Sequence, residues 1–427
     1  MVLRCGPLLA LVLSLSACSR PDPTAVDSAI AAEIGRIRAI DNHAHPVRVV
    51  LNGPPDREFD ALPVDNMEPA SDPLALRPNA PATLEAIRAL YSSAEQKSQL
   101  QREKADAWPA WVLDQTGTEV MLANRVAMGP GIQPPRFRWV PYADALIFPL
   151  DNSKLASRNS DRKSFFALEE KLRERYLDEA GRKKPPSTLS EYLLRVVTPT
   201  LERHKQGGAL AEKFEAAYLR SLDFDTVDRS TAERVYARFV GAAAPDESEY
   251  KPLEDFLFRY IAAECGRLGM AVHLHTMAGS GSYFDVAGAN PLRLESVLDD
   301  PGLRRTRFVM VHGGWPFTRE ITALLQKPNA YLDYSAQDLL LRPAQLAVTL
   351  RAWLEWVPEK ILFGTDAYPY SDQLGWEESG WIAARNGREA LATALTGMLR
   401  DGEISRDRAF ELARMVLREN ARKLYGL

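Results

Sequence analysis

Eight short segments of β-forming character, separated by longer helix-forming segments, most constrain what this chain can fold into. Strands that alternate with helices indicate parallel βα units, and eight such units are what a closed (β/α)8 barrel requires. We therefore predict an α/β fold, a TIM barrel. The predicted strands are residues 37–43, 119–124, 145–149, 209–215, 271–275, 308–312, 330–333 and 361–366.

Two connections are far longer than the loops of a minimal barrel. Residues 46–115 and 151–206 are expected to be helical insertions after strands one and three, where they would cover or shape the mouth of the barrel. Residues 404–427 carry apolar side chains near helical spacing and are expected to form the last helix. Residues 31–427 would then form one domain, whose length suits a barrel with insertions.

The first residues resemble a bacterial secretion signal. An apolar run over residues 6–17 is too short to span a bilayer but suits a signal peptide over residues 1–17. The tetrad Leu15-Ser-Ala-Cys18 resembles a lipobox, which implies cleavage before Cys18, lipidation of its sulfur and a tether over residues 18–30. The serine that follows is typical of outer-membrane sorting. The expected location is therefore the cell envelope, lipid-anchored in the outer membrane and facing the periplasm. A plain cleaved signal with an incidental Cys18 is the alternative.

The net charge limits the kinds of binding partner that the chain is expected to have. A net charge of −4 provides no basic surface for nucleic acid or anionic lipid. We expect a small-molecule substrate, and membrane contact through the lipid anchor alone, while homo-oligomer formation is left open. With the signal removed and Cys18 lipidated, Cys265 has no partner for an intramolecular disulfide.

Four of the six histidines form two His-x-His pairs at the ends of predicted strands. Residues i and i+2 of a strand point to the same face, so His43 and His45 can both face the barrel mouth, where neutral imidazole suits zinc. Asp41 shares their face and is expected to orient one of the two rings. In the second pair His275 lies nearer the strand end and is the better ligand candidate, which leaves His273 as a neighbour or a hydrogen-bonding support.

Two further strand ends carry groups typical of a catalytic site. His312, followed by two glycines, ends the sixth predicted strand, and Asp366 ends the eighth. A carboxylate at that position can bind a metal and accept a proton from water, although capping the next helix is an alternative role. Because barrel enzymes assemble their sites from several strand ends, the sequence predicts a metal site there.

These segments resemble the amidohydrolase-related family of the amidohydrolase superfamily. They look closest to the branch whose domain also occurs fused ahead of glutamine-synthetase-like domains. The resemblance covers residues 208–427 and the first strand, and it is weak across both predicted insertions. The segments that carry it are residues 40–46, 275–276, 312–320, 330–334, 361–366 and 420–427.

The resemblance implies a role for each of these site residues. His43, His45, His275 and Asp366 would hold one catalytic divalent ion, zinc or alternatively manganese. His312 would contact the substrate or a second ion, so that one or two ions remain open.

Other residues are candidates for the same site. Lys213 occupies the position of a strand-four lysine that bridges two metals as a carboxylated side chain in binuclear relatives, and an ordinary lysine that orients substrate is the alternative. Arg125 could bind a substrate carboxylate through its guanidinium, and Tyr218 and Arg220 are weaker candidates of that kind. A surface or structural arginine is the commoner outcome. His204 is expected to be a solvated helix residue.

The expected reaction is hydrolysis of a C–N or C–O bond of a small molecule by metal-activated water. Asp366 would move the proton, and His312 would help to stabilise the developing oxyanion. Two alternatives remain. One is a non-oxidative decarboxylase on the same metal site, and the other is a lipoprotein that binds a ligand without catalysis.

Overall fold

The computed structural model describes residues 25–62, 73–279 and 281–427. The predicted signal peptide and Cys18, the predicted lipidation site, lie outside the described residues. Within these ranges, no helix combines the length and the apolar character needed to cross a membrane.

The strands form an α/β fold with two parallel sheets. One sheet has the order β1-β2-β3 and the other the order β4-β5-β6-β7-β8, so neighbours in the chain are neighbours in space. The strands are β1 Ala39–Ala44, β2 Thr118–Asn124, β3 Phe137–Val140, β4 Ala211–Phe214, β5 Ala271–His275, β6 Phe308–Val311, β7 Ala330–Asp333 and β8 Ile361–Leu362.

Backbone hydrogen bonds join the two sheets at both edges. On one side Asn42 N donates to Phe363 O and Asp366 N donates to His43 O, each at 2.8 Å. On the other side Lys213 N donates to Pro141 O at 2.7 Å, next to a parallel bridge between Lys213 and Tyr142. The carboxyl ends of β1, β4 and β8 are therefore brought to the same end of the strand assembly.

Seven of the eight predicted strands overlap an observed strand, and the prediction for the third strand is wrong. Residues 145–149 begin within a 3-10 helix, Asp144–Leu146, while β3 lies earlier, at Phe137–Val140. The apolar run suggested a strand, but Leu146, Ile147 and Phe148 are buried in the core beneath covering helices and not within a sheet. A short buried run cannot be assigned to a strand by hydrophobicity alone.

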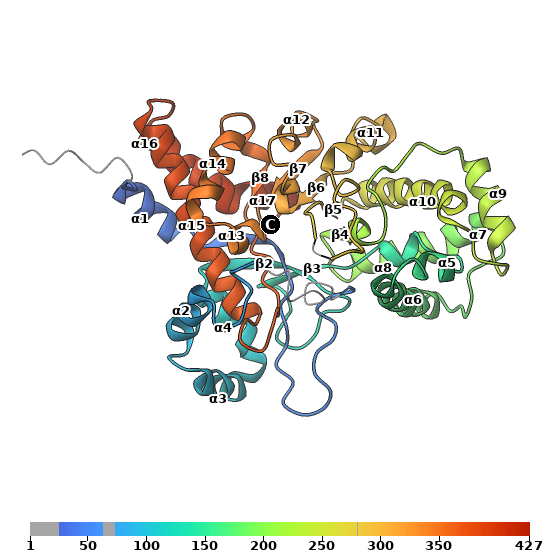
Figure 1. Cartoon of the computed structure of the whole chain (residues 1–427), viewed down its shortest axis with the longest axis horizontal. Helices are drawn as coiled ribbons and strands as arrows, with labels where there is room; N and C mark the ends of the chain where they lie inside the picture. The colour runs from blue at the N-terminus through green and yellow to red at the C-terminus, as the bar shows by residue number, and fades with distance from the viewer. Residues whose placement is uncertain (1–24, 63–72, 280) are drawn as a thin grey trace, which may run out of the picture.

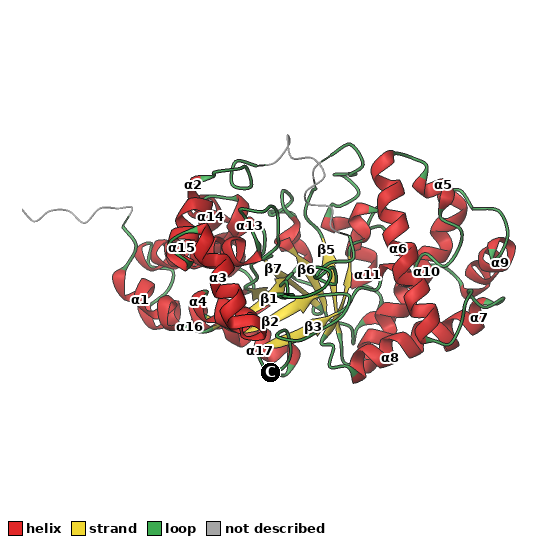
Figure 2. Ribbon diagram, turned by 90° about the horizontal axis from the view of Figure 1, so that it is seen from below, coloured by secondary structure: helices red, strands yellow, loops and turns green. Residues whose placement is uncertain are grey.

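Helices surround the strands (Figures 1 and 2), and both views draw α5 to α10 together on one side of them. Most of the predicted last helix, residues 404–427, is found as α16 Arg406–Arg414, a π-helical turn at Met415–Glu419, and α17 Asn420–Tyr425. The longer helices are α1 Ser28–Arg36, α2 Pro81–Leu90, α3 Ala94–Lys104, α4 Trp108–Gln115, α6 Ser160–Glu179, α8 Thr198–Gln206, α9 Arg229–Phe239, α10 Glu247–Leu268, α14 Pro343–Leu354, α15 Trp376–Arg400 and α16 Arg406–Arg414. Shorter ones are α5 Ser153–Ala156, α7 Leu189–Tyr192, α11 Glu295–Leu298, α12 Ile321–Leu324, α13 Gln337–Leu340 and α17 Asn420–Tyr425.

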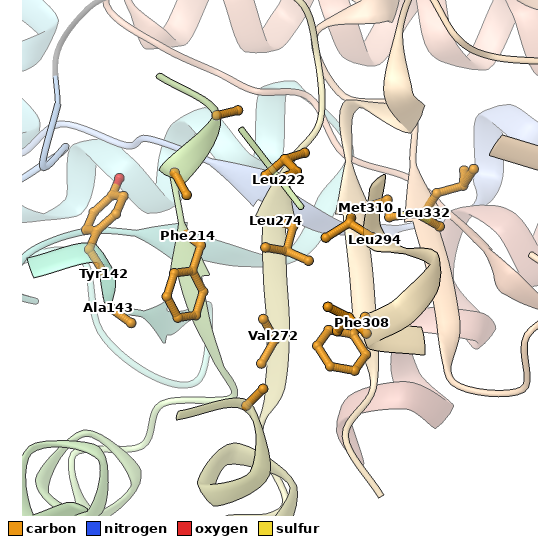
Figure 3. Close-up of a cluster of buried hydrophobic side chains, with 14 of the residues drawn as sticks. Tyr142, Ala143, Phe214, Leu222, Val272, Leu274, Leu294, Phe308, Met310 and Leu332 are labelled. Atoms are coloured by element: carbon orange, nitrogen blue, oxygen red, sulfur yellow. The ribbon is translucent and has the colours of Figure 1, made fainter. Parts of the chain in front are cut away.

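Alternate residues of the strands enter different hydrophobic clusters, as the two-residue period of a strand requires. One set packs against the surrounding helices and loops, and Figure 3 shows it running across β4 to β7: Phe214, Val272, Leu274, Phe308, Met310 and Leu332. The other set forms a separate cluster that is capped by Leu424 of α17: Ala211, Ala271, Val309 and Val311. His273, His275 and Lys213 share the alternation of this second set, which places them on the inner face.

Local sequence signals set where β5 begins. A capping box between Asp246 and Glu249 starts α10. Gly269 ends that helix in the left-handed conformation, at φ +68°, where glycine carries no Cβ penalty. Ala271 opens β5 two residues later, which fixes the register of His273 and His275.

Candidate metal centre

The side chains of His43, His45 and Asp366 converge where β1 and β8 end. Asp366 Oδ1 lies 3.2 Å from His43 Nε2 and 3.5 Å from His45 Nε2, and the three ligand atoms lie within 4.8 Å of one another. A tetrahedral zinc with ligands at 2.0–2.1 Å separates its ligand atoms by about 3.3 Å. The spacing and the donor types of this group therefore fit a divalent ion.

The backbone holds Asp366 over the histidines. Its φ of +51° is uncommon for a residue other than glycine, although aspartate tolerates it better than most. Its own N–H donates to His43 O at 2.8 Å, and two residues before Asp366 the chain passes through Gly364. Strained backbone of this kind persists where the surroundings enforce it, often at functional sites.

Hydrogen bonds to the far nitrogens leave both Nε2 atoms as acceptors. His45 Nδ1 lies 3.1 Å from Phe59 O, which can only accept, so Nδ1 carries the proton. His43 Nδ1 contacts the Asn124 side-chain amide, whose Oδ1 has no other hydrogen-bond partner among the described residues. With the amide turned so that Oδ1 accepts from Nδ1–H, His43 too has a free Nε2 lone pair, which can bind an ion shared with Asp366 Oδ1.

Burial keeps these histidines neutral. It lowers the pKa of His43 well below its ordinary value, helped by the nearby Lys213 charge. It lowers the pKa of His45 to about 4, against the opposing pull of Asp60. Neutral imidazole is the form that binds a metal, so at neutral pH no proton has to be displaced from either ring.

His275 and His312 lie beside this group. The rings of His275 and His312 are 4.7 Å apart between centroids, and those of His312 and His43 are 4.9 Å apart. His275 Nε2 is 2.9 Å from Met277 O, so that Nε2 donates and Nδ1 keeps its lone pair. His275 is outside the close three-residue group, yet it offers an acceptor nitrogen next to it. Tyr218 packs on His275 with ring centroids 4.5 Å apart, so it too borders the site.

Asp333 and Ser335 orient His312, and this role of the two residues was not predicted from the sequence. Ser335 Oγ donates to Asp333 Oδ1 at 2.6 Å and lies 2.9 Å from His312 Nδ1. His312 N also donates to Asp333 Oδ1, at 2.9 Å. A serine whose proton is committed to a carboxylate accepts from the ring, so Nδ1 carries the proton and Nε2 is an acceptor. The position of Asp333 at the end of β7 was the available signal.

Lys213 lies within the centre. Its Nζ is 3.4 Å from His43 Nε2 and 4.0 Å from Glu215 Oε1, and the side chain is buried. His273 of the adjacent strand lies away from the group, because its Nε2 is 2.7 Å from the hydroxyl of Tyr425 in α17. Of the second His-x-His pair, His275 is thus the member beside the centre.

Two expectations about supporting residues are wrong. Asp41 orients neither imidazole, because its carboxylate accepts from Thr365, from Oγ1 at 2.6 Å and from the backbone N at 3.0 Å. His204 is not solvated: it is buried, and its Nδ1 lies 2.9 Å from Glu212 Oε1. The residue types were visible in the sequence, but the partner of Asp41 follows β8 and the partner of His204 lies in β4.

Both candidate arginines are buried with protein partners. Arg125 donates from Nη2 to Asp56 Oδ1 and from Nε to Ala127 O, each at 2.9 Å. Arg220 donates to Glu254 at 2.7 Å and to Asp255 at 2.6 Å. The structure thus brings Tyr218 to the centre, while both guanidinium groups are held in ion pairs with side chains of the chain itself.

The chain belongs to the amidohydrolase family, whose model matches residues 210–427, more than half of the sequence. Protein fluG of Emericella nidulans is 30% identical over 223 residues, which are 49% of this chain and 25% of fluG. The chain therefore spans about a quarter of the length of that curated relative.

Solved structures show the same fold. A protein from Lactobacillus casei described as a metal-dependent hydrolase superposes with a TM-score of 0.68 at 16% identity, over 94% of this chain and 98% of that one. Glucuronate isomerase from Caulobacter crescentus superposes with a TM-score of 0.59 at 12% identity, over 93% of each chain. At such identities the likeness concerns the fold alone.

Proposed function

We propose that this protein is a metal-dependent hydrolase that cleaves a C–N or C–O bond of a small molecule. The observation that carries the proposal is the convergence of His43 Nε2, His45 Nε2 and Asp366 Oδ1 at distances that suit a tetrahedral ion. Membership of the amidohydrolase family supports it. We further propose that the two sheets, hydrogen-bonded at both edges, form one closed (β/α)8 barrel with the centre at its carboxyl end.

The ion is proposed to be zinc, with manganese as the alternative. His43, His45 and Asp366 would hold it, with His275 Nδ1 as a further ligand. When bound, the ion would supply Lewis acidity toward water and the scissile group. We propose one ion and not two, because Lys213 lies beside Glu215. Carboxylation would replace the positive charge of that lysine by a negative one next to a carboxylate, which is unfavourable in a buried site.

Three residues of the centre would have different roles in the reaction. Asp366 would accept the proton of the attacking water and return it to the leaving group, as a general base and then a general acid. His312, held by Ser335 with Nε2 unprotonated, would accept a hydrogen bond from the substrate or the water. This differs from the oxyanion-stabilising role expected from the sequence, because an unprotonated nitrogen cannot donate a hydrogen bond to an oxyanion. Lys213 would stabilise developing negative charge with its ammonium group.

A location in the cell envelope belongs to the same proposal. The lipobox-like tetrad that ends at Cys18 supports a lipid anchor, with the enzyme facing the periplasm and its small-molecule substrate reaching it there.

A screen of amides, lactones and carboxylates with product identification by mass spectrometry tests the reaction. We expect water-derived oxygen in the product when the assay is run in 18O-water. Asp366→Asn should lower kcat by about 100-fold or more, since general acid–base catalysis is worth 10²–10⁴. Release of CO2 without 18O incorporation would show a decarboxylase, and binding without turnover would show a binding protein.

A further inference from the structure

Four buried carboxylates gather beside the metal centre, on the side of β3 and β4. Asp60, Asp144, Glu169 and Glu215 are exposed by only 6%, 0%, 2% and 4%. They come from four separate parts of the fold: the segment after β1, the 3-10 helix after β3, helix α6 and the residue that follows β4. We name these four residues the acidic cluster.

The cluster adjoins the proposed catalytic groups. Asp60 Oδ1 lies 3.9 Å from His45 Nδ1, and Glu215 Oε1 lies 4.0 Å from Lys213 Nζ. The hydroxyl of Tyr142 lies 3.2 Å from His45 Nδ1. Glu215 therefore adjoins Lys213 at the centre itself, and Asp60 lies behind His45, beside the ring nitrogen that faces away from Asp366.

Several carboxylate oxygens of the cluster lack a partner. Both oxygens of Glu169 are buried without a hydrogen bond to any described residue, as are Glu215 Oε2 and Asp144 Oδ1. Burying a carboxylate without a donor is expensive, and buried orphan groups call for an ion, a water or a functional role. Glu169 is the clearest case because neither of its oxygens is satisfied.

The four carboxyl groups also repel one another. Burial raises the pKa of Glu169 well above its ordinary value, and the charges of Asp144 and Asp60 raise it further. Burial likewise raises the pKa of Glu215, with Asp60 the largest of the charges that add to it and Lys213 opposing. Asp144 and Glu215 are direct neighbours, because Glu215 N donates to Asp144 Oδ2 at 2.8 Å, and the charges of Asp144 and Asp60 act on Glu169. A positively charged group placed among them would relieve both the repulsion and the missing hydrogen bonds.

We propose that Asp60, Glu169 and Glu215 form a subsite for a cationic nitrogen group of the substrate, an ammonium or a guanidinium. This inference rests on the proposed function, since it assigns the class of molecule that the metal centre would cleave. The subsite suits an organic cation better than a second metal ion. Among the described residues the convergent metal-type group consists of His43, His45 and Asp366, whereas the carboxylates of the cluster do not close around one point. N–H donors that point in several directions match acceptors spread over several elements.

Calorimetry on the metal-loaded full chain tests the subsite without requiring turnover. The probes are n-butylammonium and n-butylguanidinium, with 1-butanol as the uncharged analogue. We expect both cations to bind at least tenfold more tightly than butanol. Glu169→Gln, which keeps the side-chain volume, should abolish that preference. Glu170→Gln is the matched control, because Glu170 is the next residue of α6 and pairs with Arg173 outside the cluster.

Three results would overturn the proposal. The cations could bind no better than butanol, or Glu169→Gln could leave their binding unchanged. A second equivalent of divalent metal, lost in Glu169→Gln but kept in His43→Ala, would make the cluster a metal site. The metal content of the same samples distinguishes a failure of the subsite from a failure of the proposed hydrolase function. If the chain binds no metal at the histidines but still prefers the cations, the subsite is supported and the hydrolase function is contradicted.

Discussion

Replacing Arg220 by methionine should destabilise the folded protein while leaving the metal centre in place. Arg220 is buried, with Nη1 2.7 Å from Glu254 Oε2 and Nη2 2.6 Å from Asp255 Oδ1. Removing one partner of a buried ion pair typically costs 3–5 kcal/mol, because the other charge stays buried without compensation. Asp255 keeps Lys251, 2.6 Å from its second oxygen, so Glu254 is the group left alone. We therefore expect a loss near the lower end, about 3–4 kcal/mol.

The loss can be read from thermal unfolding. An unfolding entropy of about 2.1 cal/mol/K per residue gives about 0.9 kcal/mol/K for a chain of this length, so the melting temperature should fall by about 3–5 °C. Calorimetry or circular dichroism measures that fall. Arg195→Met is the control, since Arg195 has 62% side-chain exposure and sits 3.8 Å from Glu191, and a surface pair should change the melting temperature by no more than about 1 °C.

A second variant isolates the orphaned charge. Adding Glu254→Gln to Arg220→Met removes the uncompensated carboxylate and should recover part of the lost stability. An unchanged melting temperature in Arg220→Met, together with a raised KM, would refute the structural role. That result would instead support the role that the sequence also allowed, in which Arg220 binds the substrate.

Two further predictions concern single side chains of the inner face. Burial lowers the pKa of His273 to about 3, with the Lys213 charge adding to it. Stability linked to this ring is therefore complete above about pH 6.5 and is lost as the pH falls toward 3, by about 1.4 kcal/mol per unit. Urea titrations of the metal-free protein at pH 6, 5 and 4 measure how the free energy of unfolding falls with pH. That fall should be less steep in His273→Gln than in the parent by about 1.4 kcal/mol per pH unit, and equal slopes for the two proteins would contradict the prediction. Ser335→Ala should lower kcat by about 10–100-fold, and Ser335→Thr should restore it. 15N NMR should find His312 protonated at Nδ1 in the parent and in Ser335→Thr but not in Ser335→Ala, and an unchanged tautomer in Ser335→Ala would exclude the orienting role.

The sequence predicted the parts of the fold whose signals are local. The two-residue period of strands placed His43 and His45 on one face, and the structure brings both to Asp366. The strands that were predicted well are buried runs ending in a polar residue. The third strand was missed because residues 145–149 are equally apolar, yet they are buried by helices and not by neighbouring strands.

The partners of polar residues could not be predicted, because they depend on distant segments. Glu169 lies in a charged helix that looks solvated in sequence, and only the packing of α6 buries it near Asp144 and Asp60. Asp41 and the arginines show the same limit. Their residue types were noticed, but Thr365, Asp56 and Glu254 decide what they do.

Metal content tests the central claim most directly. Elemental analysis of the purified chain should find about one equivalent of zinc or manganese. The metal should be lost in His43→Ala and in Asp366→Ala, and it should be kept in His273→Gln, whose ring faces Tyr425. A parent without metal after reconstitution, or full metal content in the His43→Ala variant, would contradict the metal centre and with it the hydrolase.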